Sequence, residues 1–215
     1  MLRITDNGNS EYVIIIRKNH SASEKTAAEE LAAYLKKITD AEIPVKTDDE
    51  KKTDHEIVIG FTNRGGKGKK ELGEEGFTIK TEGKRLFILG SEVRGALYGV
   101  YSFLEKCCGC RFYTDTCERV PQMNMLTVPE IDCTELPGFE YRNVYWFAQG
   151  GEMISAKLKN NGGMGHELTE RVGGGINYIG SFCHTFPDLG ETGNVWDMPC
   201  LSDEAMYQTV LKNVR

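Results

Sequence analysis

Three side chains in the second half of the chain could contact the hydroxyl groups and apolar faces of a sugar: Arg142, Trp146 and His184. A guanidinium donates paired hydrogen bonds to neighbouring hydroxyls or to a carboxylate, and an indole ring offers a flat apolar surface. Arg142 and Trp146 lie at even spacing in the aromatic run 139–147 (FEYRNVYWF), so in a strand their side chains share a face. His184 follows a second apolar run, 175–182 (GINYIGSF). These residues are the candidate substrate-binding site.

Each of the three residues also has a purely structural interpretation. Arg142 could be a buried ion-pair partner of Glu140 or Glu152. Trp146 could belong to an apolar core, and His184 could be a structural residue at the end of a strand. The sequence leaves both interpretations open for each residue.

The elements that would position these residues alternate along the tail. Runs 139–147 and 175–182 predict buried strands, 153–161 predicts a short helix, and Ser202 predicts the cap of a last helix that extends to about Val214. This β-α-β-α order indicates parallel strands with right-handed crossovers, as in a (β/α) barrel. A complete barrel takes about 250 residues. Residues 139–215 therefore predict the first two βα units of an incomplete barrel, with its site at the carboxyl ends of the strands.

The first 130 residues predict an α/β domain with a mixed sheet and two helices on one face. Ser21 and Glu24 form a capping box that opens a helix to about Thr39. Ser91 is expected to cap a second helix, which ends near Gly109. The expected strands are 12–17, 43–45, 56–59, 77–80, 85–89, 111–113 and 125–128. Residues 131–138 are of low periodicity and predict a linker to the tail.

Composition restricts the function. Net charge is −6, which argues against nucleic acid as the main partner because neutralising phosphates requires a basic surface. No apolar run approaches the roughly 20 residues of a membrane span, so no membrane partner is expected. The N-terminus shows no signal peptide, which predicts a cytoplasmic protein unless a leader has been removed.

No metal or cofactor site is expected from the sequence. The seven cysteines are odd in number and irregular in spacing, and neighbouring Cys107 and Cys108 point in different directions, so one metal ion would not easily bind both thiolates. They are expected to be structural thiols. His166-Glu167 begins like the zinc-protease motif HExxH, but the second histidine position is Glu170. We therefore reject a metalloprotease.

One stretch of the chain also resembles a known family. The residues that carry the resemblance are Glu75-Gly76-Phe77, Gly90-Ser91, 94–100 (RGALYGV), 103–105 (FLE) and 109–113 (GCRFY). They resemble the small α/β domain that precedes the catalytic barrel in bacterial α-glucuronidases and family 20 β-hexosaminidases. The motifs HTFPDL (184–189) and CLSDEA (200–205) are similar to those of a bacterial group that pairs this domain with a barrel.

The resemblance implies that residues 1–130 form a hexosaminidase- or α-glucuronidase-like N-terminal domain. It implies that 131–138 form a linker and that 139–215 form the start of a barrel. Similar hydrolases carry a sugar-binding arginine after a Pro-x-Phe-x-x-Arg pattern, which here ends at Arg142. Their catalytic acids follow later barrel strands, so no catalytic acid is assigned in this chain. Four carboxylates of the tail are expected in solvated loops: Glu152, Glu167, Glu170 and Asp188.

The resemblance thus predicts part of a carbohydrate-active protein of glycoside hydrolase type, inactive by itself. One alternative is a non-catalytic carbohydrate-binding or scaffolding module whose tail docks onto the small domain. Another is a self-associating fragment, because two βα units leave strand edges uncovered.

Overall fold

The computed structural model describes residues 1–66, 70–163, 167–176, 185–193, 200 and 202–214. The chain divides into two compact units, Met1–Gly175 and Ile176–Arg215. The elements in chain order are β1 (Leu2–Asp6), β2 (Val13–Ile16), α1 (Ala22–Thr39), β3 (Val45–Thr47), β4 (Glu56–Ile59), η1 (Lys70–Leu72), β5 (Phe77–Glu82), β6 (Arg85–Gly90), α2 (Gly95–Lys106), β7 (Arg111–Thr114), β8 (Cys117–Arg119), β9 (Met125–Val128), β10 (Asp132–Glu135), η2 (Phe147–Gln149), α3 (Glu152–Lys157), η3 (Glu170–Val172), α4 (Thr185–Leu189) and α5 (Glu204–Val214).

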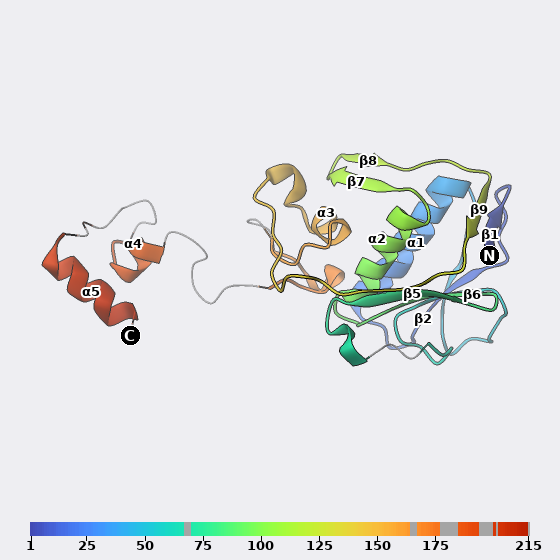
Figure 1. Cartoon of the computed structure of the whole chain (residues 1–215), viewed down its shortest axis with the longest axis horizontal. Helices are drawn as coiled ribbons and strands as arrows, with labels where there is room; N and C mark the ends of the chain where they lie inside the picture. Colours follow the sequence, from blue (N-terminus) through green and yellow to red (C-terminus); the bar gives the residue numbers. More distant parts are fainter. Residues whose placement is uncertain (67–69, 164–166, 177–184, 194–199, 201, 215) are drawn as a thin grey trace. The chain divides into compact units, whose positions relative to one another are not determined.

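A six-stranded mixed sheet of order β10-β5-β6-β4-β2-β3 forms the centre of the first unit. β3, β2, β4 and β6 run parallel to one another, and β5 and β10 are added antiparallel. α1 and α2 lie together on one face of the sheet (Figure 1). The predicted fold class, a mixed α/β sheet with two helices on one face, is confirmed for this unit. β1 pairs with β9, and β7 pairs with β8, in two small separate sheets.

The main core lies between the helices and the sheet. Leu31 and Leu35 of α1 and Val100 and Leu104 of α2 are each fully buried, against strand residues such as Ile57. The opposite face of the sheet buries a second, smaller apolar cluster, Val13, Ile15, Val58, Phe87 and Leu89. Because both faces of the sheet are covered, β4 and β6 have consecutive apolar residues after their first, charged residue, rather than alternating apolar and polar residues.

The two predicted helix starts have different outcomes. The capping box at Ser21 is present: the Ser21 side chain accepts from the Glu24 amide, and the Glu24 carboxylate accepts from the Ser21 amide. The predicted cap at Ser91 is wrong, because α2 begins only at Gly95 after Arg94. The Ser91 hydroxyl instead donates to the carbonyl of Glu74, and residues 91–94 form a turn before the helix.

The expected linker contains a strand. Asp132–Glu135 form β10, which pairs antiparallel with β5 so that Cys133 faces Ile79. The Thr78 and Thr134 hydroxyls, which belong to another facing pair of the same two strands, are 2.8 Å apart. The short polar run thus closes one edge of the central sheet.

The predicted strand 139–147 is also wrong. No residue of 139–146 is in a strand, and 147 begins η2. The backbone groups of Arg142 bond to Asn161 and Gly162, not to a neighbouring strand, and Phe139 and Phe147 are 76% and 79% exposed. A strand needs a partner for its amides and carbonyls. The described residues of 139–215 include no strand, so this run has no sheet to join.

Two helices of the tail are confirmed. α3 overlaps the predicted helix 153–161 but begins one residue earlier and ends four residues earlier, and α5 ends at the predicted Val214. The cap of α5 is Asp203 rather than Ser202, because the Asp203 carboxylate accepts from the amides of Ala205 and Met206. The second predicted strand, 175–182, lies mostly outside the described residues. α4 covers residues of the HTFPDL motif.

Candidate functional site

A buried carboxylate, Glu75, joins three segments of the first unit. Its side chain is 8% exposed. One oxygen accepts from Nε of Arg94 and Nδ2 of Asn161, each at 2.8 Å, and the other accepts from Nη2 of Arg142 at 2.6 Å. Charge-assisted bonds of this kind are the strong ones in a protein interior. We call these four residues, Glu75, Arg94, Arg142 and Asn161, the Glu75 cluster.

Arg94 reaches Glu75 because α2 begins against the turn that precedes β5. A β-carbon at Gly95 would lie 2.5 Å from the carbonyl oxygen of Gly76, so only glycine permits this approach. The Arg94 guanidinium is 5% exposed and also donates to the carboxylate of Glu74 at 2.7 Å and to the carbonyl of Gly173 at 2.9 Å. Arg94 therefore ties the sheet to a loop of the second half of the chain.

Arg142 is held by protein groups that accept from all three of its guanidinium nitrogens. Its guanidinium donates from Nε to the carbonyl of Lys159 at 2.8 Å and from Nη1 to the carbonyl of Phe139 at 2.5 Å. Its ion-pair partner is Glu75, not Glu140 or Glu152 as the structural interpretation expected. The side chain is still 20% exposed. Arg142 thus fixes the segment around it while presenting one edge to solvent.

That edge lines a pocket of about 290 Å³, which we call the Arg142 pocket. Its apolar walls come from Phe77, Leu136, Pro137 and Leu158, and its polar groups come from Glu75, Tyr98, Glu135, Arg142 and Lys159. The Tyr98 hydroxyl donates to the carbonyl of Asn160 at 2.9 Å. Burial and the nearby Glu75 charge raise the pKa of Tyr98, so this hydroxyl keeps its proton at neutral pH.

The three predicted site residues are not brought together by the described structure. Arg142 lines the pocket, whereas Trp146 is not among the described residues that line it. Trp146 is 54% exposed and immediately precedes η2, which is tied to β7 by the bond from Gln149 to the carbonyl of Tyr113. Since 139–147 is not a strand, the even spacing of Arg142 and Trp146 does not place them on one face. His184 lies outside the described residues.

Sequence reasoning missed the partners of Arg142. Glu75 and Arg94 both fall within the motifs of the resemblance, yet nothing in their spacing pairs them with Arg142 or Asn161. Asn161 has no exposed surface and follows a short helix, which gives no sequence signal of a buried polar role. Glu152, expected in a solvated loop, accepts from the amide of Thr169 at 2.9 Å.

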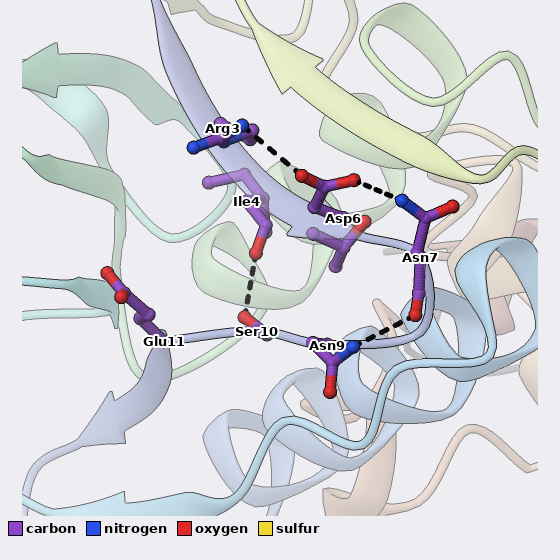
Figure 2. Close-up of a pocket in the computed structure, with 8 residues that line it drawn as sticks. Arg3, Ile4, Asp6, Asn7, Asn9, Ser10 and Glu11 are labelled. Carbon is purple, nitrogen blue, oxygen red and sulfur yellow. Dashed lines mark hydrogen bonds and ion pairs between the residues drawn. The ribbon is translucent and has the colours of Figure 1, made fainter.

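A second hollow, of about 440 Å³, lies at the turn after β1, where Figure 2 shows its lining residues. Its polar groups largely bond to one another: Arg3 to Asp6 at 3.2 Å, Asn7 to Asp6 at 2.8 Å, and Ser10 to the carbonyl of Ile4 at 2.7 Å. This hollow is exposed and offers a ligand few uncommitted groups. The Arg142 pocket is the better candidate site.

Among the residues that the structure describes, no group of three His, Cys, Asp or Glu side chains could hold a metal ion. Burial raises the pKa of Cys108 well above its usual value and that of Cys110 to about 11. Both thiols are buried and stay protonated at neutral pH. Within the same described ranges, no helix is long and apolar enough to cross a membrane.

Residues 4–103 match the family described as the glycosyl hydrolase family 67 N-terminus. The match covers β1 through most of α2, including Glu75 and Arg94 of the Glu75 cluster. Residues 4–103 are therefore similar to a glycoside hydrolase N-terminal domain. No curated protein matches the chain in sequence.

Solved structures with a similar arrangement include a family GH115 4-O-methyl-α-glucuronidase with specificity for decorated arabinogalactans, at 15% identity and a TM-score of 0.47. Another is the GH20 β-N-acetylhexosaminidase from Streptomyces coelicolor, at 17% identity and a TM-score of 0.45. Each similarity covers 66% of this chain. The chain spans only 19% of the first enzyme and 24% of the second.

Proposed function

From the similarity of residues 4–103 to a glycoside hydrolase N-terminal domain, we propose that the chain is part of a carbohydrate-active protein of glycoside hydrolase type. In this proposal the first unit is an accessory domain, and a carbohydrate, either an oligosaccharide or a glycoside, is the partner. The family match is the single observation that carries the proposal.

The Arg142 pocket is the sugar site that the geometry supports best. It combines an apolar wall with hydrogen-bonding groups whose positions are fixed by the Glu75 cluster, as small-molecule sites generally do. Its volume of about 290 Å³ lies near the lower limit of such sites. Trp146, with an exposed ring, and His184 remain proposed contacts of the same or a longer ligand.

We propose further that this chain does not hydrolyse glycosides by itself. Hydrolysis takes two carboxyl groups on either side of the scissile bond. The carboxylates of the Arg142 pocket are already engaged: Glu75 by three donors, and Glu135 by Lys106. Incubation of the purified chain with aryl glycosides and glucuronides tests this, and no release of the aryl group is expected. Turnover that disappears when a carboxylate of this chain is mutated would overturn the proposal.

The alternative function is a non-catalytic carbohydrate-binding or scaffolding module. One observation favours it: the described residues 139–163 and 167–175 belong to the same compact unit as the small domain, and they bury Ile154, Ala156, Leu168 and Val172 in its core. An open reading frame that continues past Arg215 with paired carboxylates near later strand ends would favour the hydrolase. Glycan binding without such a continuation would favour the module.

Self-association is a third proposal. Exposed apolar side chains, rather than the predicted uncovered strand edges, would make the contact between copies of the chain. Phe139 and Phe147 expose most of their rings, and Leu136 is 58% exposed. Exposed apolar groups of this size mark interaction sites when they gather on one surface. Light scattering coupled to gel filtration tests the proposal: a mass that rises with protein concentration supports it, and a constant monomer mass contradicts it.

A further inference from the structure

We infer that the Arg142 pocket takes an uncharged sugar ring rather than a uronate or another anion. This inference rests on the proposed function and names the class of ligand. It follows from the charges that line the pocket, from the partners of each charge, and from the nature of its walls.

The charges of the pocket cancel. Two cations, Arg142 and Lys159, face two carboxylates, Glu75 and Glu135. Each is already paired with a protein group of opposite charge. The Lys159 ammonium is 2.8 Å from the carboxylate of Glu105, and Arg142 is 2.6 Å from Glu75. An anionic ligand would have to compete with Glu105 for Lys159 while it lies close to Glu75.

Arg142 already donates three of its five guanidinium N–H groups to protein acceptors, one of which is the Glu75 carboxylate. Paired recognition of a carboxylate requires two parallel N–H groups of one guanidinium. Here Nη2 is bonded to Glu75, and Nη1 and Nε are bonded to the carbonyls of Phe139 and Lys159. The two N–H groups that remain belong to the same guanidinium that is bonded to Glu75, so a second carboxylate there would be repelled by Glu75, whereas a neutral hydroxyl needs only one N–H donor.

The walls of the pocket suit a pyranose. Phe77 and Leu136 both line the pocket, and Phe77 is 3% exposed whereas Leu136 is 58% exposed. Together with Pro137 and Leu158 they form the apolar part of a lining that also includes Tyr98 and Arg142. A pyranose has the matching division, with apolar C–H faces and hydroxyls around its rim. The volume of about 290 Å³ has room for one ring rather than a chain of rings.

Two probes that differ only at one carbon test the inference: methyl β-D-glucopyranoside and the corresponding methyl glucuronoside, titrated against the full chain by ligand-observed NMR at pH 7. We expect the neutral glycoside to bind with a dissociation constant of about 1 mM, as small ligands of shallow pockets do. The glucuronoside should bind more weakly.

A charge-changing variant makes the test specific to the pocket. Glu105→Gln removes the carboxylate partner of Lys159, so the Lys159 ammonium at the pocket no longer has to leave Glu105 to pair with an anionic ligand. It should strengthen glucuronoside binding about 2–5-fold, the range expected for one partly exposed ion pair, without changing binding of the neutral glycoside. Glu82→Gln is the matched control, because Glu82 pairs with Lys80 at 2.7 Å and ends β5 at the end opposite Phe77.

The outcomes separate the inference from the proposed function. Tighter binding of the glucuronoside by the unmodified chain would overturn the inference and leave a carbohydrate site in place. Equal effects of Glu105→Gln and Glu82→Gln would also overturn it, because pocket charge would then not set the preference. If neither sugar binds, both the inference and the assignment of this pocket in the proposed function fail.

Discussion

Replacing Glu75 by glutamine should release the second half of the first unit from the sheet. Glutamine keeps the shape of the side chain but removes the charge that two buried guanidinium groups share. Arg94 is 5% exposed and Arg142 is 20% exposed, so neither can regain full hydration without moving. The segment that contains Arg142 and Asn161 should therefore detach more readily.

The size of the effect follows from the burial of the partners. Removing one member of a buried ion pair costs about 3–5 kcal/mol, because an uncompensated charge stays behind. We expect the lower end, about 3 kcal/mol, since Arg94 keeps Glu74 and the carbonyl of Gly173 and Arg142 is partly exposed. For a chain of this length each kcal/mol lowers the melting temperature by about 2–4 °C. The expected shift is about 6–12 °C.

Glu74→Gln is the matched control, because Glu74 contacts the same guanidinium but is 67% exposed. An exposed pair contributes about 0–1 kcal/mol, so this variant should melt within about 4 °C of the unmodified chain. Thermal unfolding followed by far-UV circular dichroism measures both variants. Hydrogen exchange should in addition speed up in residues 139–163 and not in β4. Equal melting temperatures for the two variants would refute the argument.

Three further predictions concern other parts of the molecule. Burial raises the pKa of Tyr34, Tyr98 and Tyr101 above the usual tyrosine value of about 10, so the folded state keeps protons that the unfolded state loses. Stability should therefore fall above about pH 10, by about 1.4 kcal/mol per pH unit for each group, in urea titrations at stepped pH. A flat stability profile from pH 9 to 12 would exclude this. Gly173→Ala should destabilise the fold by about 1–3 kcal/mol in urea unfolding, because φ is +87° and the new β-carbon would lie 1.9 Å from the Val93 carbonyl oxygen. Gly174→Ala is the control and should destabilise the fold less, because the nearest atom to its new β-carbon is 4.0 Å away. The reverse order of the two destabilisations would contradict this geometry. Iodoacetamide at pH 7.5 should label exposed Cys200, whose pKa is lowered by the Ser202 hydroxyl, well before buried Cys108 when peptides are analysed by mass spectrometry.

The first domain was predictable because its local signals and its tertiary structure agree. The capping box at Ser21, the apolar stripe of α2 and the hairpin of β5 and β6 each depend on residues close in sequence. The Ser91 cap failed because a hydroxyl at a helix entry can bond to any nearby carbonyl. It bonds to Glu74, seventeen residues away, which local spacing does not reveal.

The tail was less predictable for a physical reason. The aromatic run 139–147 has the composition of a strand, but a strand forms only beside another strand. Its backbone bonds at Arg142 go to Asn161 and Gly162, and much of its apolar surface stays exposed. The pairing of Arg142 with Glu75 was unpredictable as well, because burial of a charge depends on contacts between distant segments. The sequence predicted Arg142 as a candidate site residue but did not indicate that Glu75 is its ion-pair partner.

The central claim is that the chain binds carbohydrate in the Arg142 pocket without cleaving it. The most direct test is binding of the full chain to an array of defined glycans. The Leu136→Ala variant is applied to the same array, because Leu136 lines the pocket and is exposed. We predict saturable binding to glycans with neutral terminal rings, weakened in the variant, with the glycans recovered intact. Absence of binding to any glycan, or binding that Leu136→Ala leaves unchanged, would contradict the claim.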